Sequence, residues 1–358
     1  MGLGRTMKMA SAGIGIVGLA AFVLPSAAAE AATVTVTPGH SIQAAVYGAS
    51  PGDTVHVAAG TYHESVEVTK SINLVGDGQG ATILVPPASP PSSQSSFCFN
   101  PSTPTSFNGM CIHGTVDSQG NVTAPVGPVT VTGFTVKGFD GVGVLFFGAS
   151  SPHADHVRAV NNTDYGITAF VSTNDVFDSN ITNFNGEAGI YVGDSPQANA
   201  TVTNNQANNN ANTGIFVRDA SGPGTVANNA VRGNCAGIFF LKTQSNAANP
   251  ANWDVFGNFA TANDAQCSGG GGPTMGGIGV AVIGVNSVNV HDNLIRNNRP
   301  AVPVTISGGV VVAMGASHTT VTNNQITRNA PDIFWDGTGT ANTFSGNLCH
   351  SSHPSGLC

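Results

Sequence analysis

Three features of the sequence predict an all-β, single-domain chain wound as a right-handed parallel β-helix. The first is a repeat of about 23 residues in which a glycine precedes a strand of alternating apolar residues. The second is a phrase with two asparagines that runs in step with this repeat. The third is a composition that is 41% apolar but only 8% charged, so Asn, Thr and Ser must supply the surface. We expect about ten or eleven coils behind a short capping helix.

The chain opens with a stretch that is typical of an export signal. Two basic residues, Arg5 and Lys8, precede apolar residues 9–24, and small residues suitable for cleavage follow. A membrane anchor is the alternative, but roughly 16 apolar residues are fewer than the about 20 that a span needs. We therefore assign residues 1–31 to a signal peptide and 33–358 to the β-helix. The mature protein is expected to be secreted, monomeric and without a membrane span.

The capping helix is predicted over Ser41–Gly48, because Ser41 is a favourable helix cap and Gly48 a favourable stop. The residues that follow alternate as strands, at 55–57 and 66–68. Since the terminal repeats of a solenoid need a cap, we expect the helix to cover the open end of the coils. The stretch 86–128 is rich in Pro, Ser and Gly and is predicted to leave the coils.

The glycine–strand phrase recurs seven times, and an eighth copy lacks the glycine. The copies are Gly141-Val-Gly-Val, Gly166-Ile-Thr-Ala, Gly189-Ile-Tyr-Val, Gly214-Ile-Phe-Val, Gly237-Ile-Phe-Phe, Gly277-Ile-Gly-Val, Gly309-Val-Val-Val and Asp332-Ile-Phe-Trp. Their spacings are 25, 23, 25, 23, 40, 32 and 23 residues, which fit three short strands per coil and predict a loop over 243–276. The asparagines are expected at turns, where they tolerate a left-handed backbone. Five isoleucines should form one internal stack: Ile167, Ile190, Ile215, Ile238 and Ile278.

Six cysteines in an exported chain indicate disulfides. Sequence alone allows about 15 pairings. Short loops favour Cys98 with Cys111 and Cys349 with Cys358, and Cys235 would then pair with Cys267. A thiolate metal site is the alternative, but no Cys-x-x-Cys spacing supports it.

The formal charge of −8, with no basic run, excludes nucleic acid as an expected partner. A polyanionic substrate would also be repelled unless a local cation cluster or a bound metal reversed the field.

Two segments resemble known families. Residues 41–84 resemble the opening coils of pectin methylesterases and of the wider pectate-lyase-like superfamily, which includes the copper-accessory proteins of nitrous oxide reductase. The tail 332–358 is similar to the closing coil of secreted actinobacterial β-helix repeat proteins. The resemblance implies a right-handed parallel β-helix. Asp332 matches the nucleophile motif of pectin methylesterases, but the family's Gln motif and Arg-x-Trp are absent, so we interpret Asp332 as a turn residue closing the last coil.

Outward-facing positions of the repeat predict a binding surface. Tyr191, Phe216 and Phe239 fall on successive coils and are predicted to form an exposed aromatic ladder that binds a polysaccharide. The alternative is that the loop 243–276, with Trp253, folds over the ladder.

Four charged residues lie just beyond the ladder: Asp194, Arg218, Asp219 and Lys242. The pectate-lyase-like resemblance implies carboxylates that hold Ca²⁺ and a basic residue that abstracts a proton beside a uronate carboxylate. We therefore predict Asp194 and Asp219 as Ca²⁺ ligands, and Arg218 and Lys242 as substrate-binding or catalytic residues. A surface ion-pair cluster is the alternative.

Two functions remain open. The first is an extracellular carbohydrate-active protein that binds polysaccharide and, if it is an enzyme, acts as a polysaccharide lyase or a related enzyme. The second is a non-catalytic surface or metal-accessory protein. His153 and His156 form a weak metal motif, because they lack a third ligand.

Overall fold

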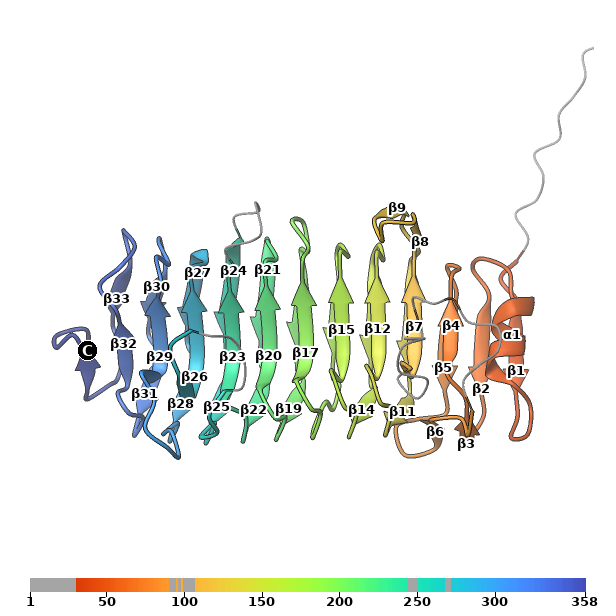
Figure 1. The fold of residues 1–358 in the computed structure, drawn as a ribbon, viewed down its shortest axis with the longest axis horizontal. Helices are drawn as coiled ribbons and strands as arrows, with labels where there is room; N and C mark the ends of the chain where they lie inside the picture. The colour runs from red at the N-terminus through yellow and green to blue at the C-terminus, as the bar shows by residue number, and fades with distance from the viewer. Residues whose placement is uncertain (1–29, 90–94, 96–97, 99–106, 244–249, 268–271) are drawn as a thin grey trace, which may run out of the picture. The chain divides into compact units, whose positions relative to one another are not determined.

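The computed structural model describes residues 30–89, 95, 98, 107–243, 250–267 and 272–358. The predicted signal peptide falls almost entirely outside these residues, so it stays a prediction. Residues from Ala31 to Cys358 form one compact unit of stacked β-coils (Figure 1). Within the described residues, no helix has the length and apolar character that crossing a bilayer requires.

The largest sheet has twelve parallel strands, one above another along the stack. In order they are β1 (Thr33–Val36), β2 (Thr54–Val57), β5 (Asn73–Gly76), β10 (Val129–Thr132), β13 (Pro152–Asp155), β16 (Val176–Asp178), β18 (Thr201–Thr203), β21 (Gly224–Ala227), β24 (Ala251–Phe256), β27 (Asn286–His291), β30 (Thr320–Thr322) and β33 (Thr343–Ser345).

A second sheet has eleven parallel strands and carries the candidate site. They are β4 (Val66–Val68), β7 (Met110–His113), β12 (Val144–Phe147), β15 (Ile167–Phe170), β17 (Ala188–Gly193), β20 (Thr213–Arg218), β23 (Ala236–Leu241), β26 (Met275–Ile283), β29 (Ile306–Ala313), β32 (Ile333–Trp335) and β34 (Ser352–His353). With one strand per coil, the two sheets match the predicted number of coils closely.

Shorter strands form the third side of the coils. They are β3 (Gly60–His63), β6 (Thr82–Val85), β11 (Phe134–Lys137) and β14 (Arg158–Val160), followed by β19 (Gln206–Asn208), β22 (Ala230–Arg232), β25 (Phe259–Thr261), β28 (Leu294–Arg296) and β31 (Gln325–Thr327). An antiparallel hairpin, β8 (Thr115–Val116) with β9 (Val122–Ala124), projects from the coils.

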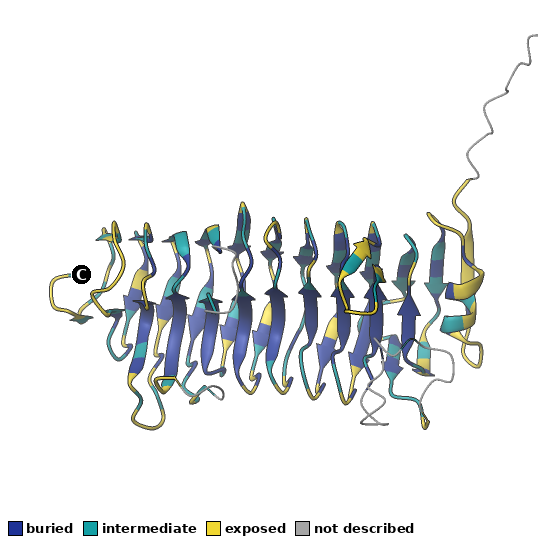
Figure 2. Ribbon diagram, turned by 45° about the horizontal axis from the view of Figure 1, so that its top comes forward, coloured by how far each residue is buried: buried dark blue, intermediate teal, exposed yellow. Residues whose placement is uncertain are grey.

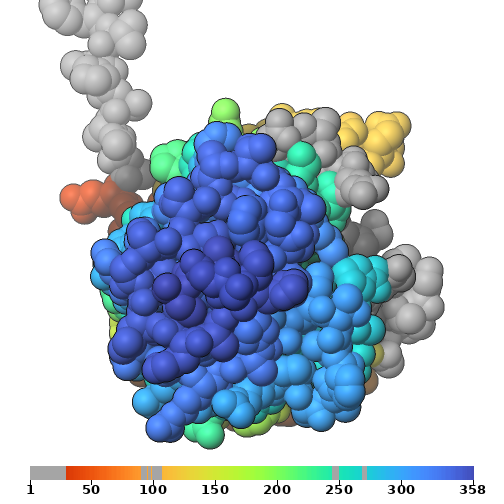
Figure 3. All heavy atoms as spheres, turned by 90° about the vertical axis from the view of Figure 1, so that its left-hand side faces the viewer, coloured from red at the N-terminus to blue at the C-terminus, as the bar shows by residue number. Residues whose placement is uncertain are grey.

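The predicted capping helix is present as α1 (Ile42–Gly48) at the N-terminal end of the stack (Figure 1). Ser41 caps it by accepting a hydrogen bond from the amide of Ala44 at 3.1 Å. Glu64 accepts from the amides of the first turn, and the Lys70 ammonium donates to three carbonyls at the last turn. These charges suit the helix dipole. At the other end, the space-filling view shows the last coil as a filled surface without a central opening (Figure 3).

The repeated glycine is required by close contact between coils. A Cβ added at Gly166 would lie 2.6 Å from the carbonyl oxygen of Gly189 in the next coil and 2.8 Å from the side-chain nitrogen of Asn185. Any larger residue would therefore push adjacent coils apart.

The internal stack is confirmed for four isoleucines and wrong for the fifth. Ile167, Ile190, Ile215 and Ile238 pair in register and are fully buried. Val280 continues this row, whereas Ile278 pairs with Ala236 in the outer cluster. The reason is that Gly279 occupies the repeat position, since its Cβ would meet the Gly309 carbonyl oxygen at 2.5 Å. The alignment of the repeat at Gly277, as predicted from the sequence, is therefore two residues too early.

Asparagines line two inner corners in continuous ladders, in which each side-chain amide donates to the side-chain oxygen of the next at 2.8–3.2 Å. One ladder contains Asn162, Asn185, Asn210, Asn234, Asn263, Asn298 and Asn329, and the other contains Asn180, Asn205, Asn229, Asn258, Asn293, Asn324 and Asn347. Turn chemistry therefore explains only the first residue of pairs such as Asn204-Asn205, where Asn204 has a φ of 57°. The second residue turns inward, where its amide is hydrogen-bonded as burial demands.

Asp332 ends one ladder, because its carboxylate accepts from the Asn329 side chain at 3.1 Å and from the His350 amide at 2.9 Å. The interpretation of Asp332 as a closing residue therefore agrees with its contacts.

Two predicted departures from the coils are smaller than expected. The segment 243–276 contains β24 and β25 and the start of β26, so its described part supplies strands to the coils. The segment 86–128 likewise supplies β7. In both, short apolar strands lie between polar stretches, and composition averaged over the segment conceals them.

Candidate functional site

The outer face of the eleven-stranded sheet carries the residues predicted to bind substrate. The strand register places Tyr191, Phe216 and Phe239 opposite one another on three successive coils, as expected. Their expected exposure is wrong, because the three are 0%, 7% and 6% exposed. Phe216 and Phe239 stack with ring centroids 5.4 Å apart, and Phe216 meets Tyr191 edge-on at 5.3 Å.

The rings are buried because they belong to a second hydrophobic cluster outside the coils. It includes Ile278 and Ile306, and side chains of 243–276 pack against it, among them Cys267 and Met275. The alternative that this segment covers the ladder is therefore correct in part. Trp253 does not take part, since it lies in the inner core, where it packs on Phe240 and donates to the Ala220 carbonyl. In Figure 2 the strands of the sheet are correspondingly buried.

Tyr191 leans along its own strand over Gly193. A Cβ at Gly193 would lie 2.1 Å from the Tyr191 hydroxyl oxygen, so only glycine leaves room for the ring. The ring centroid of Phe170 lies 4.6 Å away, and the Arg218 guanidinium carbon lies 5.5 Å from the centroid. The Tyr191 hydroxyl is buried without a hydrogen-bond partner among the described residues.

Arg218 is the centre of the charged residues predicted from the sequence. Its Nη2 lies 3.0 Å from Asp194 Oδ2, and its Nε lies 4.0 Å from Asp219 Oδ2. The side chains of Arg218 and Asp194 are 33% and 37% exposed, so both reach solvent at the edge of the buried rings. Burial alone would lower the pKa of Arg218, but Tyr191 and Asp194 raise it overall. Arg218 therefore keeps its proton.

Sequence reasoning missed three neighbours: Asp164, Tyr165 and Glu187. The rings of Tyr165 and Tyr191 are 4.9 Å apart. Burial, and next the charge of Glu187, raise the pKa of Asp164 to about 6, while Glu187 accepts a hydrogen bond from Asn212 at 2.8 Å. These residues come just before β15 and β17, outside the positions that the repeat aligns. Asp164 and Glu187 are one repeat apart, and this spacing is the sequence signal that could have indicated them. We call Asp164, Tyr165, Glu187, Asp194 and Arg218 the Arg218 cluster.

Asp219 is not included in this cluster because both oxygens of its carboxylate accept hydrogen bonds from Thr243. Its Oδ1 accepts from the Thr243 amide at 2.9 Å and its Oδ2 from the Thr243 hydroxyl at 2.5 Å. Ca²⁺ takes six to eight oxygen ligands, whereas Asp219 is committed to Thr243 and Asp194 to Arg218. The geometry does not favour Ca²⁺ at Asp194 and Asp219, and that binding stays a prediction.

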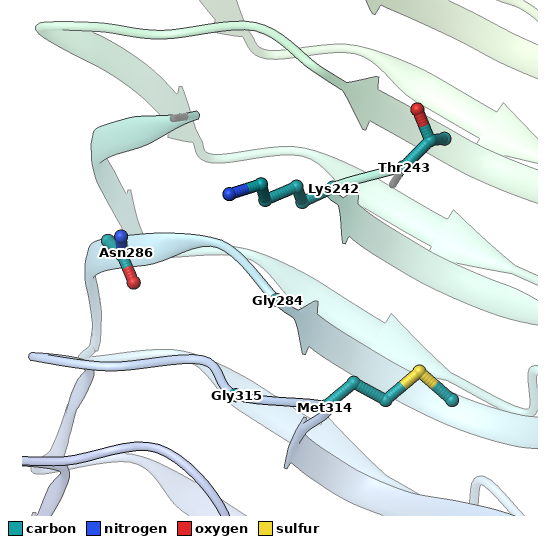
Figure 4. Close-up of a pocket in the computed structure, with 6 residues that line it drawn as sticks. All are labelled: Lys242, Thr243, Gly284, Asn286, Met314 and Gly315. Carbon is teal, nitrogen blue, oxygen red and sulfur yellow. The ribbon is translucent and has the colours of Figure 1, made fainter. Parts of the chain in front are cut away.

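Lys242 lies at the position of Asp219 in the next coil. The Asp219 amide donates to the carbonyl of Leu241, and the Lys242 amide donates to the carbonyl of Ile283. It lines a pocket of about 340 Å³, and its side chain extends toward Asn286 (Figure 4). The other lining residues are Thr243, Gly284, Met314 and Gly315.

Only one group of potential metal ligands gathers within the described residues: Glu67, Cys98 and His113, with one ligand atom each within 4.8 Å. Cys98 is bonded to Cys111, so its sulfur is not a free thiolate. Glu67 and His113 form a buried pair at 2.8 Å, and this hydrogen bond raises the pKa of His113 although burial alone would lower it. His156 pairs with Asp155, and no ligand group forms around it in the described part of the chain.

The three predicted disulfides are all present, as Cys98–Cys111, Cys235–Cys267 and Cys349–Cys358. Cys235 and Cys267 join the second hydrophobic cluster beside the rings.

Comparisons with known proteins agree with this architecture. Residues 105–253 match the family model described as a right handed beta helix region. The A-modules of the mannuronan C-5 epimerases AlgE6 and AlgE4 of Azotobacter vinelandii are structurally similar, each with 19% identity. Their TM-scores are 0.63 and 0.60, and the alignments cover 87% and 86% of this chain and 82% and 83% of theirs.

The DFA-IIIase of Arthrobacter chlorophenolicus A6 is also similar, with a TM-score of 0.54, 13% identity, and coverage of 84% of this chain and 85% of its own. No curated protein has a significantly similar sequence. At these identities the likeness concerns the fold. The chain therefore has a right-handed parallel β-helix fold.

Proposed function

We propose that this is an extracellular protein that binds polysaccharide on the outer face of the eleven-stranded sheet, around the Arg218 cluster. The observation that carries the proposal is the concentration of charge there. In a chain with only 8% charged residues, four charged side chains and Tyr165 lie partly exposed on adjacent coils beside buried aromatic rings. The similar structures support it, because two of them are named mannuronan epimerases and a third was solved in complex with GF2. The disulfides agree with an exported protein.

Arg218 is the proposed anchor for the sugar. Its guanidinium is held by Asp194 and by the face of Tyr191, so its remaining N–H groups point in fixed directions. Because its pKa is raised, it serves as a hydrogen-bond donor and not as a base. If the protein cleaves its ligand, Lys242 in the neighbouring pocket is the better candidate for proton abstraction, as expected for a lyase.

The alternative, a non-catalytic surface or accessory protein, has one observation in its favour. The positive charge of Arg218 is compensated by Asp194, and Asp219 is committed to Thr243. Charges that are already paired in this way suit binding better than turnover.

The test is glycan binding by the secreted protein and by the variant Arg218→Ala. Arg232→Ala is the matched control, because Arg232 is an exposed arginine on β22, away from the cluster. We expect Arg218→Ala to weaken binding at least tenfold, about 1.4 kcal/mol, and Arg232→Ala to bind as wild type. Equal affinity for wild type and both variants would contradict the proposed site.

Turnover and metal dependence are tested on any glycan that binds. Unsaturated products that disappear in Lys242→Ala, with binding retained, would support a lyase. A loss of binding on chelation that is restored by Ca²⁺ would support the calcium prediction, and unchanged binding would contradict it.

A further inference from the structure

One exposed aromatic residue breaks a regular row at the corner before the eleven-stranded sheet. Each coil here places one residue in the left-handed region. From Asn161 onward this residue immediately precedes a residue of the asparagine ladder, while Gly138 precedes Phe139, whose amide donates to Asn162. The row reads Gly138, Asn161, Phe184, Asn209, Gly233, Ala262, Asn297 and Arg328. Phe184 has a φ of 60° and is 57% exposed. Asparagine and glycine suit this backbone, whereas a bulky aromatic residue there is a strained exception.

The structure gives Phe184 no stabilising role that would offset this strain. Its ring belongs to none of the hydrophobic clusters of the described residues. An asparagine at this position, as in the coils on either side, would relieve the strain. Strain of this kind is commonly retained at functional sites.

Phe184 borders a shallow concave surface of about 500 Å³. Asn161 and Asn209, from the coils on either side, line it together with Thr163 and Gly186. None of the eight described residues that line it is charged. An apolar ring beside uncharged donors and acceptors suits the apolar face and the hydroxyl groups of a neutral sugar.

This surface is continuous with the Arg218 cluster along the chain. Thr163 is followed by Asp164 and Tyr165, and Gly186 by Glu187. We propose that the corner surface around Phe184 binds a neutral sugar unit of the same polysaccharide, as an additional subsite. This inference rests on the proposed function. It restricts the ligand, because the carboxylates of Asp164 and Glu187, which directly follow Thr163 and Gly186 in the chain, would repel uronate units.

The experiment is calorimetric titration of the secreted protein with cellohexaose, xylohexaose and laminarihexaose, and with hexamers of galacturonate and mannuronate. Three forms are compared: wild type, Phe184→Asn, and Arg328→Asn as the matched control in the same row. Because neighbouring coils carry asparagine here, both variants should fold. We expect a neutral hexasaccharide to bind wild type and Arg328→Asn equally and Phe184→Asn about tenfold more weakly. Phe184→Tyr should restore binding.

Melting temperature provides an independent readout. Relief of strain should raise the Tm of Phe184→Asn by about 2 °C while binding falls. Wild-type affinity in Phe184→Asn would overturn the corner subsite and leave the proposed function standing. Binding of uronate hexamers alone would overturn the neutral ligand class. Wild type that binds none of the five hexamers would overturn both this inference and the proposed function.

Discussion

The two faces of the eleven-stranded sheet are built from alternate residues of the same strands, yet they follow different rules. The inner row is apolar in every coil but the last: Val66, Met110, Val144, Ile167, Ile190, Ile215, Ile238, Val280, Val310 and Ile333, followed by Ser352. The outer row is mixed: Glu67, Cys111, Leu145, Thr168, Tyr191, Phe216, Phe239, Ala281, Val311, Phe334 and His353. Inner residues pack against one another in a closed, close-packed interior, so they remain mostly apolar. Outer residues are not enclosed in this way, so charged, polar and aromatic side chains occur among them.

The largest expected effect comes from Asp175, a carboxyl group in the interior that breaks the inner rule. It is fully buried between the positions of Pro152 and Ala200, without a hydrogen-bond partner in the described structure, and burial raises its pKa to about 8. A raised folded-state pKa means that stability is complete below the unfolded value of 3.8 and is lost as pH rises toward 8. The loss reaches about 4 kcal/mol by pH 7.

Asp175→Ala should therefore be more stable than wild type, by a margin that grows from pH 4 to pH 8. Urea unfolding at pH 4, 6 and 8 measures this margin. Asp175→Asn is the control, because it removes the charge and keeps the volume, and its margin should have the same pH dependence. Parallel stability curves for wild type and both variants would show that Asp175 is not the buried acid described here.

Adjacent residues on opposite faces give the next largest effect. Ile215 is fully buried inside the coils and Phe216 is 7% exposed outside them. Because both are packed, Ile215→Ala and Phe216→Ala should each lower the free energy of unfolding by about 3 kcal/mol. Chemical denaturation measures both, and glycan titration should find Phe216→Ala unchanged in affinity. If Phe216→Ala instead lost little stability and bound glycan more weakly, the result would support the exposed aromatic ladder predicted from the sequence.

The asparagine ladders allow a test of whether the free energy of unfolding depends on buried hydrogen bonds as well as on apolar packing. Asn229 accepts two hydrogen bonds from Asn205 and donates to Val202 and Asn258 through its side chain. Asn229→Ala removes these bonds and leaves buried groups without partners, which should cost about 3 kcal/mol. Thermal unfolding measures it. Asn228→Ala, at the solvent-facing residue beside it, is the control and should cost less.

The smallest expected effect concerns the Tyr191 hydroxyl, which is buried without a partner among the described residues. Tyr191→Phe removes an unsatisfied polar group, so it should be neutral or more stable by up to about 1 kcal/mol. The ring stays between Phe170 and Arg218, so glycan affinity should not change. A loss of binding in Tyr191→Phe would mean that the hydroxyl becomes accessible to ligand and belongs to the site.

Much of the architecture follows from patterns along the chain. The period near 23 residues, the capping helix at Ser41 and the cysteine pairs were all correctly predicted from residue type and spacing. The rows of Tyr191, Phe216 and Phe239, and of Asp194, Asp219 and Lys242, were also aligned correctly. Each of these rests on local spacing, which the regular stacking of coils translates directly into position.

Burial and partners, in contrast, were decided by tertiary structure. Ile278 lies in the outer cluster because it precedes the repeat glycine Gly279, as Ala236 precedes Gly237, and only the pairing with the neighbouring strand identifies this position. The aromatic ladder was expected to be exposed, and it is buried because segments far along the chain pack over it. The inward asparagines look like ordinary turn residues in sequence, since only the adjacent coil supplies their hydrogen bonds.

The sequence by itself determined that this chain winds into coils, how many residues each coil uses and where the chain is cross-linked, because these follow from periodicity and backbone preference. The tertiary structure decided which outward residues meet solvent, which carboxylates already have hydrogen-bond partners, and that the exposed Phe184 takes a left-handed conformation at its corner. Those properties depend on atoms in neighbouring coils, whose distances no local pattern contains.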